Sequence, residues 1–305
     1  MMKNFDLGIS SNWEYDVDFV SLLEKRFQDE GLSTYVIHPN NVTEVKEELL
    51  HKRLTFSCYL DRAWDVDERF EEIGKILQRR KTKIFNPYKN VLHAIDKASM
   101  HLEFMTAGLH VPYSIIIPPH NQKEDIKLSV EDLAILGRPF IIKPCNTTGG
   151  GIGVVTGAES LKEVLKERAA YTHDKYLIQE KIYPGIIAGH RTWFRCFGVF
   201  GKVIVVFWDD QTHIYEVITE ELKSKINVKK LNQITKTILG IIQLDFFSTE
   251  VVLTNENKFV VIDYVNDQCD MRLKSKHVDG VPDEIVDLII SYLIKAVTKA
   301  KADLL

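Results

Sequence analysis

The sequence predicts an α/β protein that begins with a parallel sheet and ends in a part where helices accompany antiparallel strands (α+β). Two observations lead to this fold class. Strand-like and amphipathic helical segments alternate through the first part of the chain, as in 5–10, 17–31 and 33–39. Repeated strand–helix–strand units form parallel sheets with helices on both faces. After about residue 190, strand instead follows strand through tight turns, as at Gly201-Lys202.

The elements expected in the first block alternate in type. Strands are expected at 5–10, 33–39, 54–60 and 81–87, and helices at 17–31, 43–52 and 67–80. In such a sheet, ligands bind beyond the carboxyl ends of the strands. Those ends carry Ser10, His38, Asp61 and Arg62.

The rest of the chain divides into two further blocks. In the middle block we expect a helix at 96–109, an edge strand with prolines at 111–119, a strand at 138–144, a strand and helix over 153–169, and a strand at 176–182. In the last block we expect strands at 191–201 and 202–208, one charged helix at 219–240, a hairpin with arms 248–254 and 259–267, and a helix at 283–301.

Composition excludes several classes of function. The 305 residues carry a net charge of about −4, so no overall basic field attracts nucleic acid or an anionic membrane. The apolar stretches, such as 202–208, are too short to span a bilayer, and residues 1–10 lack the layout of a signal peptide. The four cysteines are widely separated, which is typical of a cytoplasmic protein with free thiols. The sequence gives no oligomeric state.

A glycine-rich segment, "IIKPCNTTGGGIGV" at 141–154, carries the first functional signal. Its lysine precedes the glycines, which excludes a Walker A loop, and strand-like residues follow it, which excludes a dinucleotide fingerprint. A strand–loop–strand flap remains, with a solvated surface hairpin as the alternative. In a flap, Lys143 neutralises a phosphate, and the loop supplies hydroxyl and backbone donors from Thr147, Thr148, Gly149, Gly150 and Gly151.

The C-terminal hairpin carries the second signal. If its turn centres on residues 256–257, Glu250 lies directly opposite Asp263, and two carboxylates so close repel unless a cation lies between them. Asn266 adds an amide oxygen, and such ligands suit Mg²⁺. The alternative is two exposed acids on a solvated face. Asp245 and Asp267 are reserve ligands.

Together these parts resemble the ATP-grasp superfamily, of the carboxylate–amine/thiol ligase type that includes glutathione synthetase and ribosomal-protein glutamate ligase. The resemblance rests on the order of "AIDKASM" (94–100), "GLHVP" (108–112), the glycine segment, "LIQEKIYPG" (177–185), Arg195 and the acidic hairpin. It implies an ATP-grasp fold with an N-terminal Rossmann-like domain at 1–93, a central subdomain with the flap at 94–180, and a C-terminal subdomain with the metal hairpin at 181–305.

The resemblance also implies a site for ATP with one or two Mg²⁺ ions, which Mn²⁺ could replace. Lys97 and Lys143 match the phosphate-binding lysines, and 147–153 match the flap. Arg195 matches the arginine that faces the transferred phosphoryl group. The segment that would hold adenine is Gln179, Glu180, Lys181 and Ile182, and the metal ligands would be Glu250, Asp263 and Asn266. The spacing from Asp263 to Asn266 is one residue longer than in the family, so either a bulge corrects it or Asp267 replaces Asn266.

The implied reaction activates a carboxylate with ATP, and an amine or similar nucleophile then displaces phosphate. Lys143, Arg195 and Arg272 are the predicted catalytic cations. Arg191, Trp193 and Arg195 alternate on one strand face, and Arg62 and Arg272 would approach from the other side. These arginines predict a small anionic carboxylate substrate. Two alternatives stay open: a kinase like the inositol-phosphate kinases, and a nucleotide-binding protein without turnover.

Overall fold

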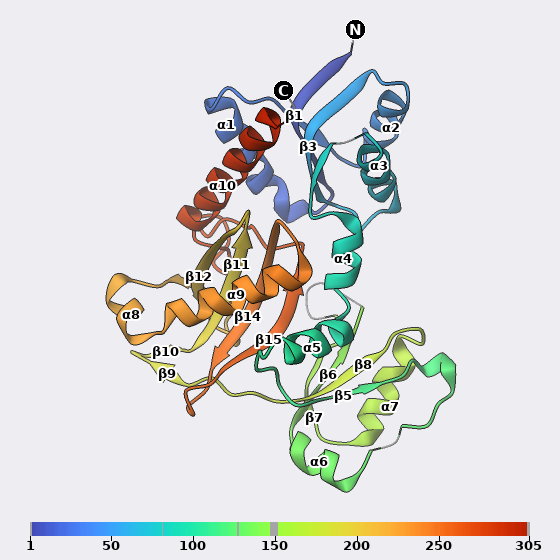
Figure 1. The fold of residues 1–305 in the computed structure, drawn as a ribbon. Coiled ribbons are helices and arrows are strands. Elements are labelled where there is room, and N and C mark those ends of the chain that lie inside the picture. Colours follow the sequence, from blue (N-terminus) through green and yellow to red (C-terminus); the bar gives the residue numbers. More distant parts are fainter. Residues whose placement is uncertain (1, 81, 127, 147–151, 304–305) are drawn as a thin grey trace.

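The computed structural model of this chain describes residues 2–80, 82–126, 128–146 and 152–303. Three sheets follow one another from the N-terminal part at the top of Figure 1 to the lobe at its lower end. None of the described helices is long and apolar enough to cross a membrane.

The first sheet is wholly parallel and has the strand order β2-β1-β3-β4. Its strands are β1 (Lys3–Ser11), β2 (Thr34–Ile37), β3 (Leu54–Arg62) and β4 (Lys83–Phe85). One face packs on α2 (Val42–Leu50) and α3 (Glu68–Gln78), and the other packs on α1 (Val17–Asp29) and the C-terminal helix α10 (Asp283–Ala302) (Figure 1). The predicted parallel sheet with helices on both faces is confirmed, and one of its covering helices comes from the far end of the chain.

The lobe at the lower end of Figure 1 holds an antiparallel sheet with the order β5-β8-β6-β7. These strands are β5 (Ser114–Ile117), β6 (Phe140–Pro144), β7 (Val155–Ala158) and β8 (Tyr176–Glu180). The prediction from its flanking prolines that β5 is an edge strand is confirmed. The helices of this middle part of the chain are α4 (Tyr88–Ala94), α5 (Lys97–Thr106), α6 (Val130–Leu136) and α7 (Leu161–Ala170), with a short 3-10 turn at His120–Gln122. A second 3-10 turn, Glu14–Asp16, lies in the N-terminal part just before α1.

The C-terminal sheet is antiparallel, with the order β13-β12-β11-β14-β15. Its strands are β11 (Trp193–Val199), β12 (Lys202–Trp208), β13 (Tyr215–Val217), β14 (Phe246–Leu253) and β15 (Phe259–Asn266), and a small ladder pairs β9 (Ile186–Ile187) with β10 (His190–Arg191). The prediction of a single helix at 219–240 is wrong. The structure has α8 (Glu220–Lys225) and α9 (Val228–Ile242), because Ile226 is extended and Asn227 caps a new helix by accepting a hydrogen bond from the backbone of Lys230.

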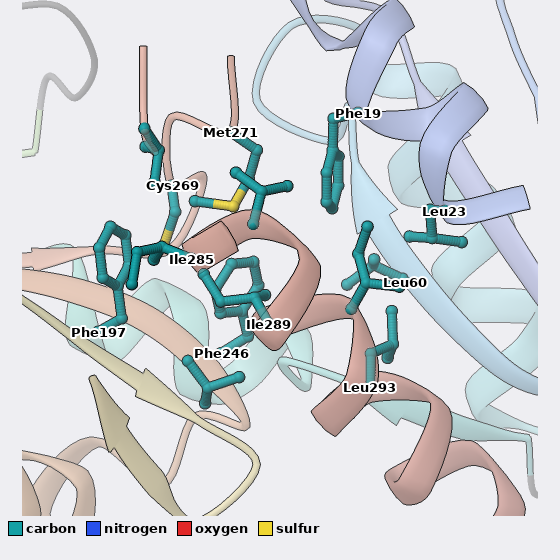
Figure 2. Close-up of a cluster of buried hydrophobic side chains, with 14 of the residues drawn as sticks. Phe19, Leu23, Leu60, Phe197, Phe246, Cys269, Met271, Ile285, Ile289 and Leu293 are labelled. Atoms are coloured by element: carbon teal, nitrogen blue, oxygen red, sulfur yellow. The ribbon is translucent and has the colours of Figure 1, made fainter. Parts of the chain in front are cut away.

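One apolar core joins the N-terminal and C-terminal sheets. Figure 2 shows Phe19 and Leu60 of the N-terminal part on one side of Ile289 and Leu293 of α10, and Phe197 of β11 at the left of the view. A second core lies between α9, α5 and the opposite face of the C-terminal sheet. Because α10 packs against both sheets, the carboxyl end of the parallel sheet is fixed relative to the acidic hairpin.

Candidate functional site

Three charged side chains stand in one row across the C-terminal sheet. Arg195 of β11 pairs directly with Glu250 of β14, and Glu250 pairs directly with Asp263 of β15. Glu250 is opposite Asp263 as expected, although the reason differs. The turn centres on residue 256, where Leu253 pairs with Phe259, and a register shift between Glu250 and Val251 brings Glu250 opposite Asp263. The position of Arg195 beside them was not expected from spacing, because β11 and β14 lie far apart in the sequence.

The Glu250 carboxylate is bound from two sides. One oxygen lies 2.8 Å from Arg195 Nη2, and the other accepts a hydrogen bond of 2.9 Å from Trp193 Nε1. Burial raises the pKa of Glu250 and the neighbouring Asp263 adds to this, while Arg195 opposes it. Burial alone would lower the pKa of Arg195, but Glu250 and Asp263 raise it above its ordinary value. Arg195 and Glu250 thus form a largely buried ion pair next to Asp263.

A bulge in β15 accommodates the extra residue in the spacing from Asp263 to Asn266. Glu250 pairs with Asp263 while Ser248 pairs with Asn266, so β15 carries one extra residue between the two pairs. The intervening Tyr264 and Val265 are buried, whereas Asp263 and Asn266 are both partly exposed. The side chains of Asp263 and Asn266 form no hydrogen bond to another described residue. Carboxylate and amide oxygens are therefore available beside Glu250.

The two reserve metal ligands, Asp267 and Asp245, form hydrogen bonds or ion pairs with other side chains. Asp267 is buried and accepts hydrogen bonds of 3.0 Å each from Trp64 Nε1 and Gln268 Nε2. Asp245 is paired with Lys83 at 3.1 Å. The structure therefore favours Asn266 over Asp267 as the partner of the two carboxylates.

Lys143, on β6 of the middle sheet, contacts the strand that carries Asp263. Its Nζ donates a 3.2 Å hydrogen bond to the carbonyl oxygen of Ile262, next to Asp263. Burial lowers the pKa of Lys143, Asp263 and Glu250 act in the opposite direction, and the charge of Lys97 lowers it further. Both predicted lysines, both carboxylates and Arg195 are thus close enough to interact electrostatically.

Lys97 is positioned by the start of α5. The Asp96 side chain caps this helix by accepting from the backbone of Ala98 and Ser99, and Lys175 Nζ lies 2.7 Å from its carboxylate. The backbone nitrogen of Lys97 donates to the carbonyl oxygen of Cys145, just after β6. These bonds hold the first turn of α5 against the strand that carries Lys143.

The predicted adenine segment divides into two halves. Gln179 is 1% exposed and its amide is directed into the protein, while a Glu180 oxygen accepts a 2.6 Å hydrogen bond from the backbone of Tyr113. Lys181 and Ile182 leave β8 toward the C-terminal sheet, and their backbone groups form no hydrogen bond to another residue of the described chain. Within this segment, the backbone groups of Lys181 and Ile182 are thus without a hydrogen-bond partner in the described part of the chain.

The other predicted arginines already have acidic partners. Arg272 Nη2 lies 2.7 Å from Asp270 and 3.0 Å from Asp279. Arg62 is buried and forms two hydrogen bonds to Asp16 and one to the carbonyl oxygen of Cys269, and Arg191 pairs with Asp210. Sequence spacing could not reveal these partners, since the residues that meet Arg62 come from both ends of the chain.

The flap residues Thr147, Thr148, Gly149, Gly150 and Gly151 lie outside the described residues. Gly153, just after them, has a φ of +73°, and a Cβ there would lie 2.9 Å from the Tyr171 ring. A side chain at this position would be strained by both its backbone and its neighbours.

Sequence reasoning missed the aromatic surroundings of Arg195. Its guanidinium carbon lies 4.6 Å from the centre of the Trp208 ring, and Trp208 stacks on His213 with centroids 5.3 Å apart. The signal available was the strand alternation that places Trp193 and Arg195 on one face, with Trp208 ending the next strand.

A small cavity lies between the N-terminal part and the residues after Asn266. Its lining includes Tyr59, Asp61, Trp64 and Asp267. Burial raises the pKa of Asp61 to about 7, although hydrogen bonds from the Ala63 backbone and the Tyr59 hydroxyl act in the other direction. The cavity is acidic and aromatic, and no arginine is among its lining residues.

Comparison with solved structures identifies the architecture. An ATP-grasp RimK domain protein from Sphaerobacter thermophilus superimposes with a TM-score of 0.64 at 17% identity, covering 94% of this chain and 98% of that one. D-alanine–D-alanine ligase from Bacillus anthracis, solved with ATP, gives 0.64 at 15% identity over 97% and 98% of the two chains. The chain has the ATP-grasp fold. The ATP-grasp ligase PsnB, solved with minimal precursor, Mg and ADP, gives 0.62 at 12% identity over 94% and 98%.

Neither the protein-family models nor the curated protein sequences match this chain. The ATP-grasp fold is therefore evident in the arrangement of its elements rather than in overall sequence identity. Within this fold, the row of Arg195, Glu250 and Asp263 lies where the C-terminal sheet meets Lys143 of the middle sheet.

Proposed function

We propose that this ATP-grasp chain is an ATP- and Mg²⁺-dependent ligase that joins a carboxylate to an amine or similar nucleophile through an acyl phosphate. The observation that carries the proposal is the convergence of Lys143, Arg195, Glu250 and Asp263 at the junction of two sheets. The proteins to which the fold is similar include ligases solved with ATP, or with Mg and ADP.

The residues fit a magnesium ion. No group of three or more His, Cys, Asp and Glu side chains able to hold a metal occurs in the part of the chain that the structure describes. A metal at the hairpin would use Asp263, the amide oxygen of Asn266 and a remaining lone pair of Glu250, whose two oxygens already bind Arg195 and Trp193. It would complete its coordination with nucleotide phosphates, as Mg²⁺ commonly does. When bound, it would neutralise charge on the phosphate oxygens. Mn²⁺ has the same preference for oxygen ligands.

The remaining groups would bind and orient the reactants. Lys97 and Lys143 would balance phosphate charge, and the free backbone groups of Lys181 and Ile182 would face the adenine edge. The Nε of Arg195 is buried and has no hydrogen-bond partner among the described residues. We assign the Arg195 guanidinium, which is 11% exposed, to the reacting carboxylate or phosphoryl oxygen, where a fixed donor in a water-poor site stabilises developing charge. Arg272 would reach the substrate only by exchanging its acidic partners.

The test is a mass-spectrometric product screen. Purified protein is incubated with ATP, Mg²⁺ and a pool of amino acids, small carboxylates and amines, with Lys143→Met as the control. A product equal to two pool members less one water, formed with ADP and free phosphate, is expected. A phosphorylated pool member with ADP and no free phosphate would replace the ligase proposal with a kinase. Intact ATP in a protein that binds it would indicate binding without turnover of this pool.

A further inference from the structure

Tyr264 lies between the two proposed metal ligands of β15, and its hydroxyl group is buried. It is 2% exposed and lies 2.6 Å from Nδ1 of His101 on α5. Gln179 of β8 donates to the same hydroxyl oxygen from Nε2 at 3.2 Å. His101 and Gln179 are 4% and 1% exposed. Three different elements therefore meet at one phenol oxygen.

The hydrogen bonds of this cluster run in one consistent direction. Gln179 donates one N–H to Ser114 Oγ at 2.9 Å and the other to the Tyr264 oxygen, and Ser114 donates to the carbonyl oxygen of Pro112. Tyr264 is then left with its own proton to donate to His101. The Gln179, Ser114 and Tyr264 donors each have an acceptor, and a satisfied hydrogen-bond network in the interior favours one geometry over its alternatives.

The cluster is placed where the register of β15 is set. The extra residue of the bulge falls between Asp263 and Asn266, which encloses Tyr264. The Tyr264 ring packs edge-on against Phe104 of α5, with centroids 5.3 Å apart. Because side chains alternate along a strand, a slip of one residue would turn Asp263 to the opposite face. The ring and hydroxyl of Tyr264 oppose that slip.

The same cluster links the metal strand to both nucleotide elements. His101 lies on the helix that begins at Lys97, and Gln179 lies on the strand that continues into Lys181. We propose that Tyr264, held by His101 and Gln179, is a positioning residue that fixes the β15 bulge and so keeps Asp263 and Asn266 on the metal-binding face. This inference rests on the proposed function.

The test uses Tyr264→Phe, which keeps the ring and removes the hydroxyl. Binding of a non-hydrolysable ATP analogue is measured as Mg²⁺ is titrated. Loss of a group that orients metal ligands weakens metal affinity by about 10- to 100-fold, so we expect a shift of that size, with metal-free analogue binding within about twofold of wild type. Tyr176→Phe is the matched control, because that buried tyrosine of β8 donates to the carbonyl oxygen of Glu167, away from the hairpin.

Amide hydrogen exchange of the metal-free protein supplies an independent readout. Tyr264→Phe should increase exchange in residues 262–266 without a comparable increase in β14 or α9. If Tyr264→Phe fails to fold, His101→Phe removes one of the two bonds to the hydroxyl and is expected to give a smaller shift of the same kind. Unchanged Mg²⁺ affinity together with unchanged exchange would overturn the inference, as would an equal loss in Tyr176→Phe. A wild-type protein that binds no Mg²⁺–nucleotide would instead overturn the proposed function.

Discussion

Replacing Asp263 by Asn should separate metal binding from stability. The Asp263 carboxylate lies opposite Glu250 and has no hydrogen-bond partner among the described side chains. Asn has nearly the same shape, so packing is preserved. The substitution removes the negative charge that the proposed metal ion needs, and it also removes the repulsion between the two acids.

The expected change in stability is small because opposing charge effects cancel. Cross-strand neighbours lie about 5 Å apart, and two unit charges at that distance interact by about 3 kcal/mol at an effective dielectric constant of 20. Asp263→Asn removes one such repulsion, from Glu250, and weakens attractions to Lys143 and Arg195. We therefore expect the unfolding free energy of the metal-free protein to change by less than about 1 kcal/mol, which corresponds to at most about 4 °C in Tm.

The assay is thermal unfolding with and without Mg²⁺ and ATP. A ligand at 100 times its Kd stabilises the wild type by about 2.7 kcal/mol, and Asp263→Asn should lose most of this gain. Asp245→Asn is the matched control, since it removes the same charge from a residue paired with Lys83 and should retain the gain. A full Mg²⁺-dependent gain in Asp263→Asn would refute the metal assignment. If Asp263→Asn lowered the unfolding free energy of the metal-free protein by more than about 3 kcal/mol, the expected cancellation of charge effects would be refuted.

Three further predictions follow from buried charges. Lys143→Met should weaken nucleotide binding by about 10- to 100-fold, measured by calorimetry, without lowering the unfolding free energy, because burial disfavours this ammonium group. Arg62→Met should cost about 3–5 kcal/mol in denaturant unfolding, since it strands the buried Asp16 carboxylate; Asp16→Leu/Arg62→Met should recover most of that loss, and a double variant as unstable as the single would contradict this. The raised pKa of Asp61 means that its contribution to stability is present below about pH 4 and is lost as pH rises through about 7. Asp61→Asn should therefore flatten the pH dependence of unfolding over that interval, and a profile parallel to wild type would contradict the assigned pKa.

Local patterns predicted the hairpin well. The two arms and their facing acids were predicted correctly, although Glu250 reaches Asp263 through a register shift next to Val251 that the sequence did not reveal. The unusual spacing to Asn266 was itself a sign of the second irregularity, between Ser248 and Glu250. The parallel sheet followed from the same kind of regular alternation. These features depend on neighbours within a few residues, which sequence periodicity reports directly.

Contacts between distant segments could not be predicted in this way. Arg62 was expected to face a substrate, but it meets Asp16 and the backbone of Cys269, 207 residues further along the chain. The hydrogen bond from the Gln179 side chain to Tyr264 likewise joins residues 85 positions apart, and no local pattern indicated it. Strand parity tells which face a side chain occupies, but which segment covers that face is decided by how the three sheets are assembled.

The measurement that tests the central claim most directly is a crystal structure with Mn²⁺ and a non-hydrolysable ATP analogue, using the anomalous signal of the metal. The account predicts a metal peak in direct contact with oxygen atoms of Glu250, Asp263 and Asn266, and nucleotide phosphates beside Lys143. A metal peak in the acidic cavity lined by Asp61 and Asp267, with no peak at the hairpin, would contradict it.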